Sequence, residues 1–180
     1  PGEIYFDVRY AGICHSDIHT ARGEWGPVAY PLVPGHEFVG VVARVGEGAT
    51  RFAVGDRVGV GCMVGSCGQC EMCGAGYEQW CTGTPGTLWT YRADADGNPT
   101  TGGYSRGFTV REDFALHVPE SLDFSACAPL LCAGITTYSP LKHYNVGPGS
   151  RVAILGMGGL GHVGVQIAKA MGAEVSVISH

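Results

Sequence analysis

Charged side chains are scarce in this sequence, because Asp, Glu, Lys and Arg make up only 15% of its 180 residues. Basic residues are the rarer kind, with 11 Lys and Arg against 16 Asp and Glu, which gives a formal net charge of −5. A net acidic chain is a poor ligand for nucleic acid or anionic lipid, so we expect neither as a partner. The low charge and the 45% share of hydrophobic residues predict a folded chain with a well-buried core.

Long apolar runs are also missing. The two longest uncharged stretches, 124–141 and 152–168, are interrupted by proline or glycine, so we expect no membrane-spanning segment. The chain begins with Pro1 and has no basic segment ahead of an apolar one, so no signal peptide is visible and we expect a cytoplasmic protein. We also expect the chain to be part of a longer enzyme, cut at both ends. Its 30 glycines and 10 prolines follow no collagen-like period and predict many turns.

Cysteine, in contrast, is plentiful and clustered. Four of the eight cysteines lie in one short stretch, at Cys67, Cys70, Cys73 and Cys81. Thiolates three residues apart in a tight turn can converge on one cation, and we expect Gly68 and Gly74 to supply left-handed turns. A cluster of disulfides, the alternative, needs a secretory context that the sequence does not show. We therefore predict a closed, structural zinc site with no open position for substrate. Cys62 and Cys127 are interpreted as packing residues.

Hydrophobic periodicity predicts mostly short strands and loops in the N-terminal part. Residues 4–10 alternate between apolar and polar, and 38–45 and 57–60 are β-branched runs bounded by glycine. The strand pattern continues over 104–118. Beyond it, we expect Ser125 to cap a helix that runs through Leu131 and Thr136. An all-β region followed by the opening of an α/β region implies two domains, with a boundary near residue 124.

The C-terminal part is predicted to be a β-α-β unit, with strands at 152–155 and 175–178 and a helix at about 159–171. The loop after its first strand fits the pattern G-x-G-x-x-G. The first glycine makes the turn, the second lets a pyrophosphate approach the backbone, and the third lets helix and strand pack closely. The position between a strand and a helix favours a dinucleotide site, formed by Gly156, Gly158, Gly159, Leu160 and Gly161.

A second set of possible metal ligands is scattered along the chain. Cys14, His36 and Cys132 each stand beside small residues, in Gly-Ile-Cys-His-Ser-Asp, Pro-Gly-His-Glu and Leu-Leu-Cys-Ala-Gly. Two thiolates and one imidazole would hold zinc and leave a fourth position for water or substrate. Spacing alone makes this a weak case, since a single His or buried Cys is usually a structural residue.

Taken together, these motifs resemble the zinc-dependent alcohol dehydrogenases of the medium-chain dehydrogenase/reductase family, and within it the cinnamyl-alcohol-dehydrogenase type. The chain also contains Gly-Asp-Arg-Val, the four-cysteine loop and Gly-x-Gly-Gly-Leu-Gly-His, and the order of all these motifs carries the resemblance. The resemblance covers nearly the whole chain. It implies a GroES-like, mostly-β catalytic domain over 1–124, lacking its first strands and carrying a structural zinc lobe. Residues 125–180 would then be a linking helix and the first β-α-β of an incomplete Rossmann domain.

Catalytic zinc ligands follow from the same resemblance. The family's two cysteines and one histidine fall on Cys14, His36 and Cys132, and this ligand set is taken from the family. Glu37 corresponds to the neighbouring carboxylate that can approach or replace the bound water. Asp17 matches the family's acid behind the histidine, where a carboxylate would fix the tautomer of His36.

The resemblance also assigns a proton relay and a pocket wall. Ser16 and His19 match the relay, and Trp89 matches an aromatic residue that lines the substrate pocket. An alternative for Ser16 is a purely structural role as the N-cap of a short helix after Cys14.

The implied function is a zinc-dependent oxidoreductase that interconverts primary alcohols and aldehydes, with two zinc ions per subunit, in a homodimer or homotetramer. Two alternatives stay open at this point. One is a polyol or secondary-alcohol dehydrogenase of the same family, and the other is a non-catalytic zinc-binding or redox-sensing module.

Coenzyme choice is predicted from the end of the second strand. NAD-dependent Rossmann proteins usually carry an acid there, about 20 residues after the glycine loop, that binds the ribose hydroxyls. At the end of this strand the sequence reads Ser179-His180, without a carboxylate, and Glu174 precedes the strand and is too early. We therefore expect NADP(H), with Ser179 as a phosphate contact. The alternative is an acid just beyond His180.

Overall fold

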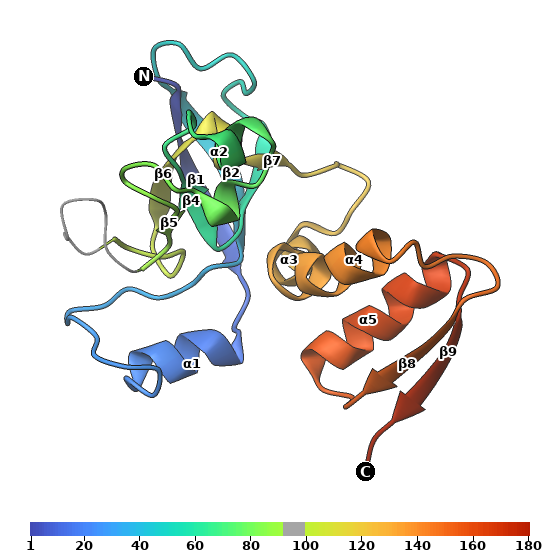
Figure 1. Cartoon of the computed structure of the whole chain (residues 1–180). Coiled ribbons are helices and arrows are strands. Elements are labelled where there is room, and N and C mark those ends of the chain that lie inside the picture. Colours follow the sequence, from blue (N-terminus) through green and yellow to red (C-terminus); the bar gives the residue numbers. More distant parts are fainter. Residues whose placement is uncertain (92–99) are drawn as a thin grey trace. The chain divides into compact units, whose positions relative to one another are not determined.

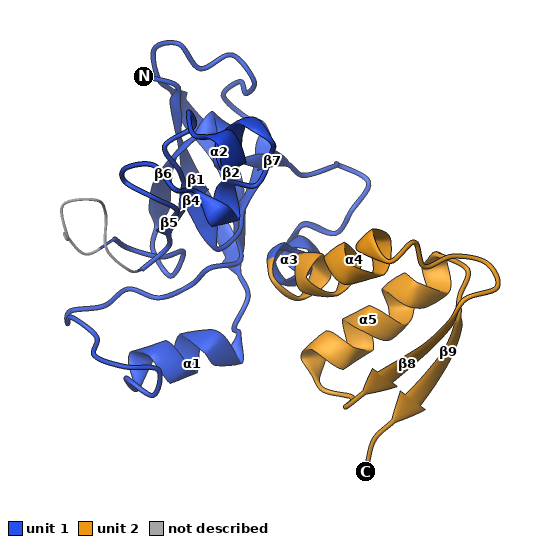
Figure 2. Cartoon of the chain, in the orientation of Figure 1, with its two compact units in different colours: residues 1–131 blue, residues 132–180 orange. Residues whose placement is uncertain are grey.

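A computed structural model describes residues 1–91 and 100–180 of the chain (Figure 1). The contacts between residues divide the chain into two units, Pro1–Leu131 and Cys132–His180 (Figure 2). The domain boundary near residue 124 stays a prediction. No helix among the described residues is both long and apolar enough to cross a membrane.

The first unit is built around a five-stranded antiparallel sheet with the order β6-β1-β2-β3-β7 (Figure 1). Its strands, in that order, are Gly107–Arg111, Glu3–Ala11, Phe38–Val45, Arg57–Val60 and Leu116–His117. Alternation puts Ile4 and Phe6 of β1 in the core, at 1% and 0% exposure. The predicted mostly-β fold is therefore confirmed.

Three phenylalanines hold the centre of this core. The ring of Phe38 lies 5.9 Å from that of Phe6 and 4.9 Å from that of Phe108, in stacked and edge-to-face arrangements. Gly103 lies directly against this group, because a Cβ at residue 103 would be 2.1 Å from the Phe38 ring. The backbone before β6 can pass this close only because residue 103 has no side chain.

Short elements complete the first unit. Helix α1 (His15–Ala21) follows β1, and a small lobe follows β3. The lobe contains the hairpin β4 (Met63–Gly65) and β5 (Leu88–Trp89), helix α2 (Glu71–Gly74) and the 3₁₀ turn η1 (Glu78–Trp80). A second 3₁₀ turn, η2 (Glu112–Phe114), connects β6 to β7.

The helix predicted through Leu131 and Thr136 is interrupted. It consists of α3 (Phe124–Cys127), the 3₁₀ turn η3 (Ala128–Leu131) and, in the second unit, α4 (Ala133–His143). Pro129 lacks the N–H that a continuous helix would need at this place.

Ser125 does not cap this helix, so that prediction is wrong. Asp123 is the N-cap, and its Oδ1 accepts the Ser125 N–H at 2.9 Å and the Ala126 N–H at 3.1 Å. The Ser125 hydroxyl itself donates to the same oxygen at 2.6 Å. An ionised carboxylate in front of the first turn satisfies more free N–H groups than a serine inside that turn.

The second unit contains the predicted β-α-β arrangement. Strands β8 (Arg151–Leu155) and β9 (Glu174–Ile178) pair in parallel, and α5 (Gly159–Ala170) connects them. Helix α4 packs against α5, with Thr137 of α4 facing Gly164 of α5.

The two cysteines interpreted as packing residues differ. Cys127 is 6% exposed and lies in a small apolar cluster with Val39, Val118 and Ala128. The packing interpretation is confirmed for Cys127. It is wrong for Cys62, which is exposed at the point where the chain leaves the sheet between β3 and β4.

The contact between Gly103 and the aromatic core gives a stability prediction. Gly103→Ala should lower the free energy of unfolding by about 1–3 kcal/mol, because the new methyl group would overlap the Phe38 ring. Thermal and urea unfolding measure the loss. Gly159→Ala is the control, since no atom lies within 4 Å of a Cβ added there. Equal stability of the two variants would contradict the tight contact.

Candidate metal centres and coenzyme loop

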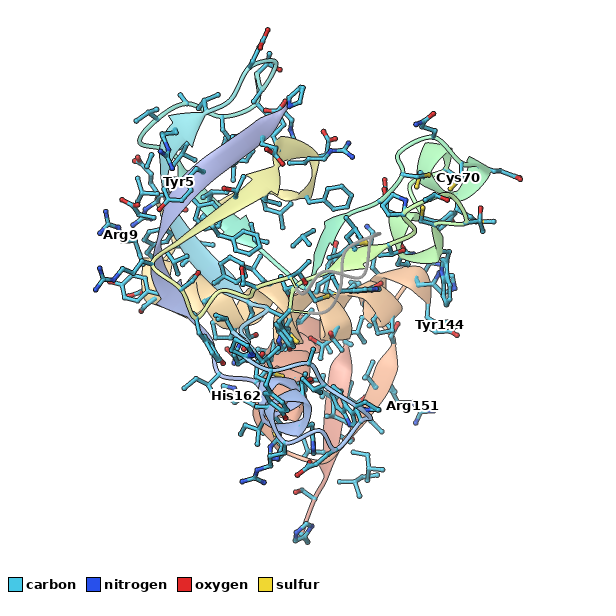
Figure 3. All side chains as sticks on the ribbon, turned by 90° about the vertical axis from the view of Figure 1, so that its left-hand side faces the viewer. Tyr5, Arg9, Cys70, Tyr144, Arg151 and His162 are labelled. Carbon is cyan, nitrogen blue, oxygen red and sulfur yellow. The ribbon has the colours of Figure 1, made fainter. Side chains whose placement is uncertain are left out.

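The four clustered cysteines converge in the small lobe after β3. Their Sγ atoms all lie within 4.8 Å of one another. Cys67 and Cys73 are 3.9 Å apart between sulfurs, and Cys70 and Cys81 are 4.0 Å apart. Figure 3 shows sulfur atoms gathered around Cys70. Four thiols at this separation match the ligand number and type of a closed zinc site.

Backbone N–H groups point at these sulfurs. Cys67 Sγ accepts from Gln69 and Cys70 N–H, both at 3.4 Å, and these bonds lower the pKa of the Cys67 thiol. The Cys73 N–H donates to Cys70 Sγ at 3.5 Å and is the largest cause of a pKa of about 5 at Cys70.

Cys73 behaves in the opposite way. The Ser66 hydroxyl, 3.4 Å from its sulfur, favours the thiolate, but burial and the neighbouring thiols outweigh it and raise the pKa of Cys73 to about 11. The lobe therefore favours the thiolate form of some of these cysteines and disfavours ionisation of all four at once. A bound cation removes that conflict, because it compensates the accumulated negative charge.

The turns of the lobe follow the prediction in part. Gly68 has a left-handed backbone with φ +70°, as expected. Gly74 does not, and that expectation is wrong, because Gly74 is the last residue of α2. The left-handed residue is Gly76, with φ +77°, where the chain leaves the helix.

The second candidate centre starts at Cys14 and His36, at the end of the main sheet. Asp17 links the two: its Oδ1 lies 2.9 Å from His36 Nδ1 and accepts the Gly35 N–H at 3.0 Å. Its Oδ2 accepts the Cys14 N–H at 3.2 Å. Asp17 and His36 are 2% and 4% exposed. The Nδ1 bond leaves Nε2 of His36 as the nitrogen that can bind a metal.

A ligand atom of Cys14 and one of His36 lie within 4.8 Å of each other. Cys132, the third predicted ligand, is the first residue of the second unit and directly follows Leu131. It precedes α4, and its carbonyl accepts the Thr136 N–H at 2.9 Å.

Two tyrosines that the sequence analysis did not single out belong to this network. Tyr91 Oη lies 2.8 Å from His36 Nδ1, and Tyr104 Oη lies 3.0 Å from Asp17 Oδ2. Burial alone would raise the pKa of Asp17. Hydrogen bonds from His36, from Tyr91 and from the Gly35 N–H outweigh burial and hold that pKa at about 2. No local spacing rule connects these tyrosines to Asp17, so no sequence signal could have found them.

The N-cap of helix α1 is Cys14, not Ser16. Cys14 has extended backbone angles, and its Sγ accepts the Ser16 N–H at 3.5 Å, while the Asp17 carboxylate accepts the Cys14 N–H. The alternative role of Ser16 as the N-cap is therefore wrong. Ser16 lies within the first turn, where its hydroxyl is not needed to start the helix.

His19 is one helical turn beyond Ser16, so the two side chains share a face of α1. Its Nδ1 pairs with Glu24, and the hydrogen bond from His19 is the largest cause of the lowered pKa of Glu24. The imidazole ring also stacks on Trp25, with 5.1 Å between ring centroids.

The remaining predicted residues of this centre lie nearby in the same unit. Glu37 is 3% exposed, and burial raises the pKa of its carboxyl group. Its Oε1 passes close to Gly12, where an added Cβ would be 2.5 Å away. Trp89 lies on β5, two residues before Tyr91.

The glycine loop between β8 and α5 has the geometry of a dinucleotide site. Gly156 turns the chain with φ +88°, and Gly158 is the N-cap of α5. Gly161 must be glycine, because a Cβ would lie 2.0 Å from the Gly156 carbonyl oxygen. Gly159 and Leu160 form the first turn of α5, whose free N–H groups suit a phosphate.

Strand β9 begins at Glu174, so the expectation that Glu174 precedes the strand is wrong by one residue. Glu174 still lies at the amino end of β9. Ser179 directly follows the carboxyl end, which in parallel sheets is the edge where ligands bind.

Comparison with known proteins matches residues 1–120 to the alcohol dehydrogenase GroES-like domain. NADP-dependent alcohol dehydrogenase C 1 of Mycolicibacterium smegmatis is 61% identical over 180 residues, which cover 99% of this chain and 51% of that protein. The chain thus spans about half the length of the curated relatives it matches.

Solved structures agree with this match. A cinnamyl alcohol dehydrogenase from Sorghum bicolor superposes with a TM-score of 0.94 at 47% identity, covering 99% of this chain and 51% of that one. A cobalt- and zinc-bound thermostable alcohol dehydrogenase from Pyrobaculum aerophilum gives 0.83 at 33% identity, covering 100% and 52%. The resemblance to alcohol dehydrogenases of the cinnamyl type is confirmed, and the chain belongs to the family defined by the alcohol dehydrogenase GroES-like domain.

Proposed function

We propose that the protein containing this chain interconverts primary alcohols and aldehydes by hydride transfer with NADP(H), mainly in the direction of aldehyde reduction. The observation that carries this proposal is the buried Asp17–His36 pair beside Cys14, which prepares one imidazole and one thiolate as metal ligands. The names of the relatives, an NADP-dependent alcohol dehydrogenase among them, support the activity.

The residues present fit a catalytic zinc ion held by Cys14, His36 and Cys132. Asp17 accepts a hydrogen bond from Nδ1 of His36, which makes Nε2 the ring nitrogen that would coordinate the metal, and two thiolates with one imidazole leave an open position. When bound, zinc supplies a Lewis acid for the alcohol or carbonyl oxygen. Cys67, Cys70, Cys73 and Cys81 fit a separate, structural zinc ion, since four sulfurs within 4.8 Å of one another supply all four ligands of a closed site.

The chain's own residues handle the proton of the reaction. Oxidation of an alcohol gives a hydride to the coenzyme and releases one proton. We assign Ser16 to receive that proton from the alcohol oxygen and His19 to pass it to solvent, because both lie on one face of α1 and His19 is partly exposed. Glu37 would stand next to the metal, and Trp89 would line the substrate pocket.

Coenzyme binding is assigned to the second unit. The pyrophosphate would lie against Gly156, Gly158, Gly159, Leu160 and Gly161 at the start of α5. Ser179 would donate to the 2′-phosphate, since it directly follows the carboxyl end of β9. We also propose that the protein is a cytoplasmic homodimer or homotetramer.

An aldehyde-dependent NADPH oxidation assay on the full-length protein tests the activity. Turnover of simple aromatic or aliphatic aldehydes is expected. A protein that binds zinc but oxidises no NADPH with any aldehyde would instead be a non-catalytic module, and the proposal would be abandoned.

The division between two metal centres predicts two zinc ions per subunit. Cys70→Ser should reduce folding yield, because binding of structural zinc is coupled to folding. Cys132→Ser should keep the fold, lose one zinc ion and lose activity. Metal analysis and thermal unfolding distinguish the two, with Cys62→Ser as the control that keeps both ions. Only one zinc ion in the unmodified protein would refute the assignment.

The proton relay predicts that Ser16→Ala and His19→Ala lower turnover by about 10² without releasing zinc. The kcat for alcohol oxidation and the zinc content are measured as a function of pH. Ser125→Ala, which removes a hydroxyl that donates to Asp123 Oδ1, serves as the control. Unchanged turnover in Ser16→Ala would remove this residue from the relay.

The strand end predicts a clear preference for NADPH over NADH. Ser179→Asp should shift the ratio of the two kcat/KM values toward NADH by at least about tenfold, because the new carboxylate repels the 2′-phosphate. Glu174→Gln, at the opposite end of β9, should leave the ratio unchanged. A native preference for NADH would show that the coenzyme assignment is mistaken.

A further inference from the structure

The segment Gly102–Tyr104 runs alongside the residues that lead into His36. Three backbone bonds join the two segments: Gly102 N–H to Val33 at 2.6 Å, Gly103 N–H to Gly35 at 2.8 Å and Tyr104 N–H to Pro34 at 3.0 Å. A Cβ on Gly102 would lie 2.4 Å from the Gly35 oxygen, so a side chain there would separate them. The backbone of Tyr104 is thereby hydrogen-bonded to the segment that leads to His36, one of the proposed zinc ligands.

The side chain of Tyr104 reaches the segment that leads to Cys14, the other proposed zinc ligand in this unit. Its Oη lies 3.0 Å from Asp17 Oδ2 and 3.0 Å from the carbonyl oxygen of Gly12. Neither partner can donate, so one phenolic proton is shared between two acceptors. Gly12 leads from β1 to Cys14, and Asp17 orients His36. The Tyr104 hydroxyl group therefore connects Asp17, which orients His36, with the segment that leads to Cys14.

Burial of apolar surface does not explain this tyrosine. Tyr104 is 38% exposed, whereas its hydroxyl is directed at a carboxylate that is 2% exposed. Phenylalanine would cover the same surface as well. Removal of the hydroxyl would leave Asp17 Oδ2 with the Cys14 N–H, at 3.2 Å, as its other donor.

We propose that Tyr104 is a positioning residue for the catalytic metal centre: its hydroxyl holds the Asp17 carboxylate and the Gly12 carbonyl together, so that Cys14 and His36 keep the geometry in which they retain zinc. The proposal rests on the proposed function, in which these residues bind a catalytic zinc ion. Tyr104 acts through Asp17 and contacts neither the substrate nor the metal.

The direct test is the rate at which zinc leaves the full-length protein. A chromophoric chelator in excess should remove two zinc ions in two phases from the unmodified protein. The faster phase is expected from the open, catalytic centre, and it should accelerate about tenfold in Tyr104→Phe. This factor is at the lower end of the effect of mutating residues that hydrogen-bond to metal ligands. The slower phase, from the four-cysteine site, should not change. Tyr5→Phe, which removes a hydroxyl from β1 at the face covered by Arg44, should release zinc at the native rate.

A double-mutant cycle separates positioning from general support of the fold. Asp17→Asn alone should also accelerate zinc release, and Tyr104→Phe should add less than twofold in that background, because its acceptor has already changed. A purely structural tyrosine would add the same factor in both backgrounds. The absorption spectrum of the cobalt-substituted protein should change in Tyr104→Phe and stay native in Tyr5→Phe.

The possible failures are distinguishable. If the unmodified protein holds one zinc ion only, the proposed function fails and this inference fails with it. If two ions are present but Tyr104→Phe releases them at the native rate, or its effect is fully additive with Asp17→Asn, only the role of Tyr104 is overturned.

Discussion

The carboxylate of Asp17 is the interaction on which the candidate active site depends. It is almost fully buried, and it receives hydrogen bonds from two backbone N–H groups, from the imidazole of His36 and from the phenols of Tyr91 and Tyr104. A buried carboxylate without such partners would be strongly unfavourable. Except for the Cys14 N–H, the donors come from segments that are distant from Asp17 in sequence. Folding of the sheet and ordering of the ligands are therefore parts of one process.

The register of the main sheet brings these segments together. Ala11 at the end of β1 pairs with Phe38 at the start of β2, and beyond this pair the Gly12 N–H donates to the Glu37 carbonyl at 2.8 Å. The ladder thus continues into the two segments that carry Cys14 and His36. A shift of one residue would turn the alternate side chains to the other face and separate the ligands.

Features with local causes could be predicted from the sequence. The convergence of the four cysteines and the position of the glycine loop between a strand and a helix are both confirmed, because each depends on residues close together in the chain. Small errors arose where one polar or flexible residue took the role of a neighbour, as Asp123 did for Ser125 and Gly76 did for Gly74. Sequence patterns could not reveal the role of Tyr104, because Asp17 lies 87 positions away along the chain and the two residues meet only in the folded protein.

Two proposed metal ligands also start helices. Cys14 is the N-cap of α1 and Cys70 is the N-cap of α2, and in each the sulfur accepts a backbone N–H from the first turn. A free N–H group at the start of a helix therefore faces each sulfur atom. Serine is itself a favourable N-cap, so a relative with serine at either position would keep the helix start while losing the ligand. Metal binding and helix initiation, although they use the same side chain, are thus separable traits on which selection can act one at a time.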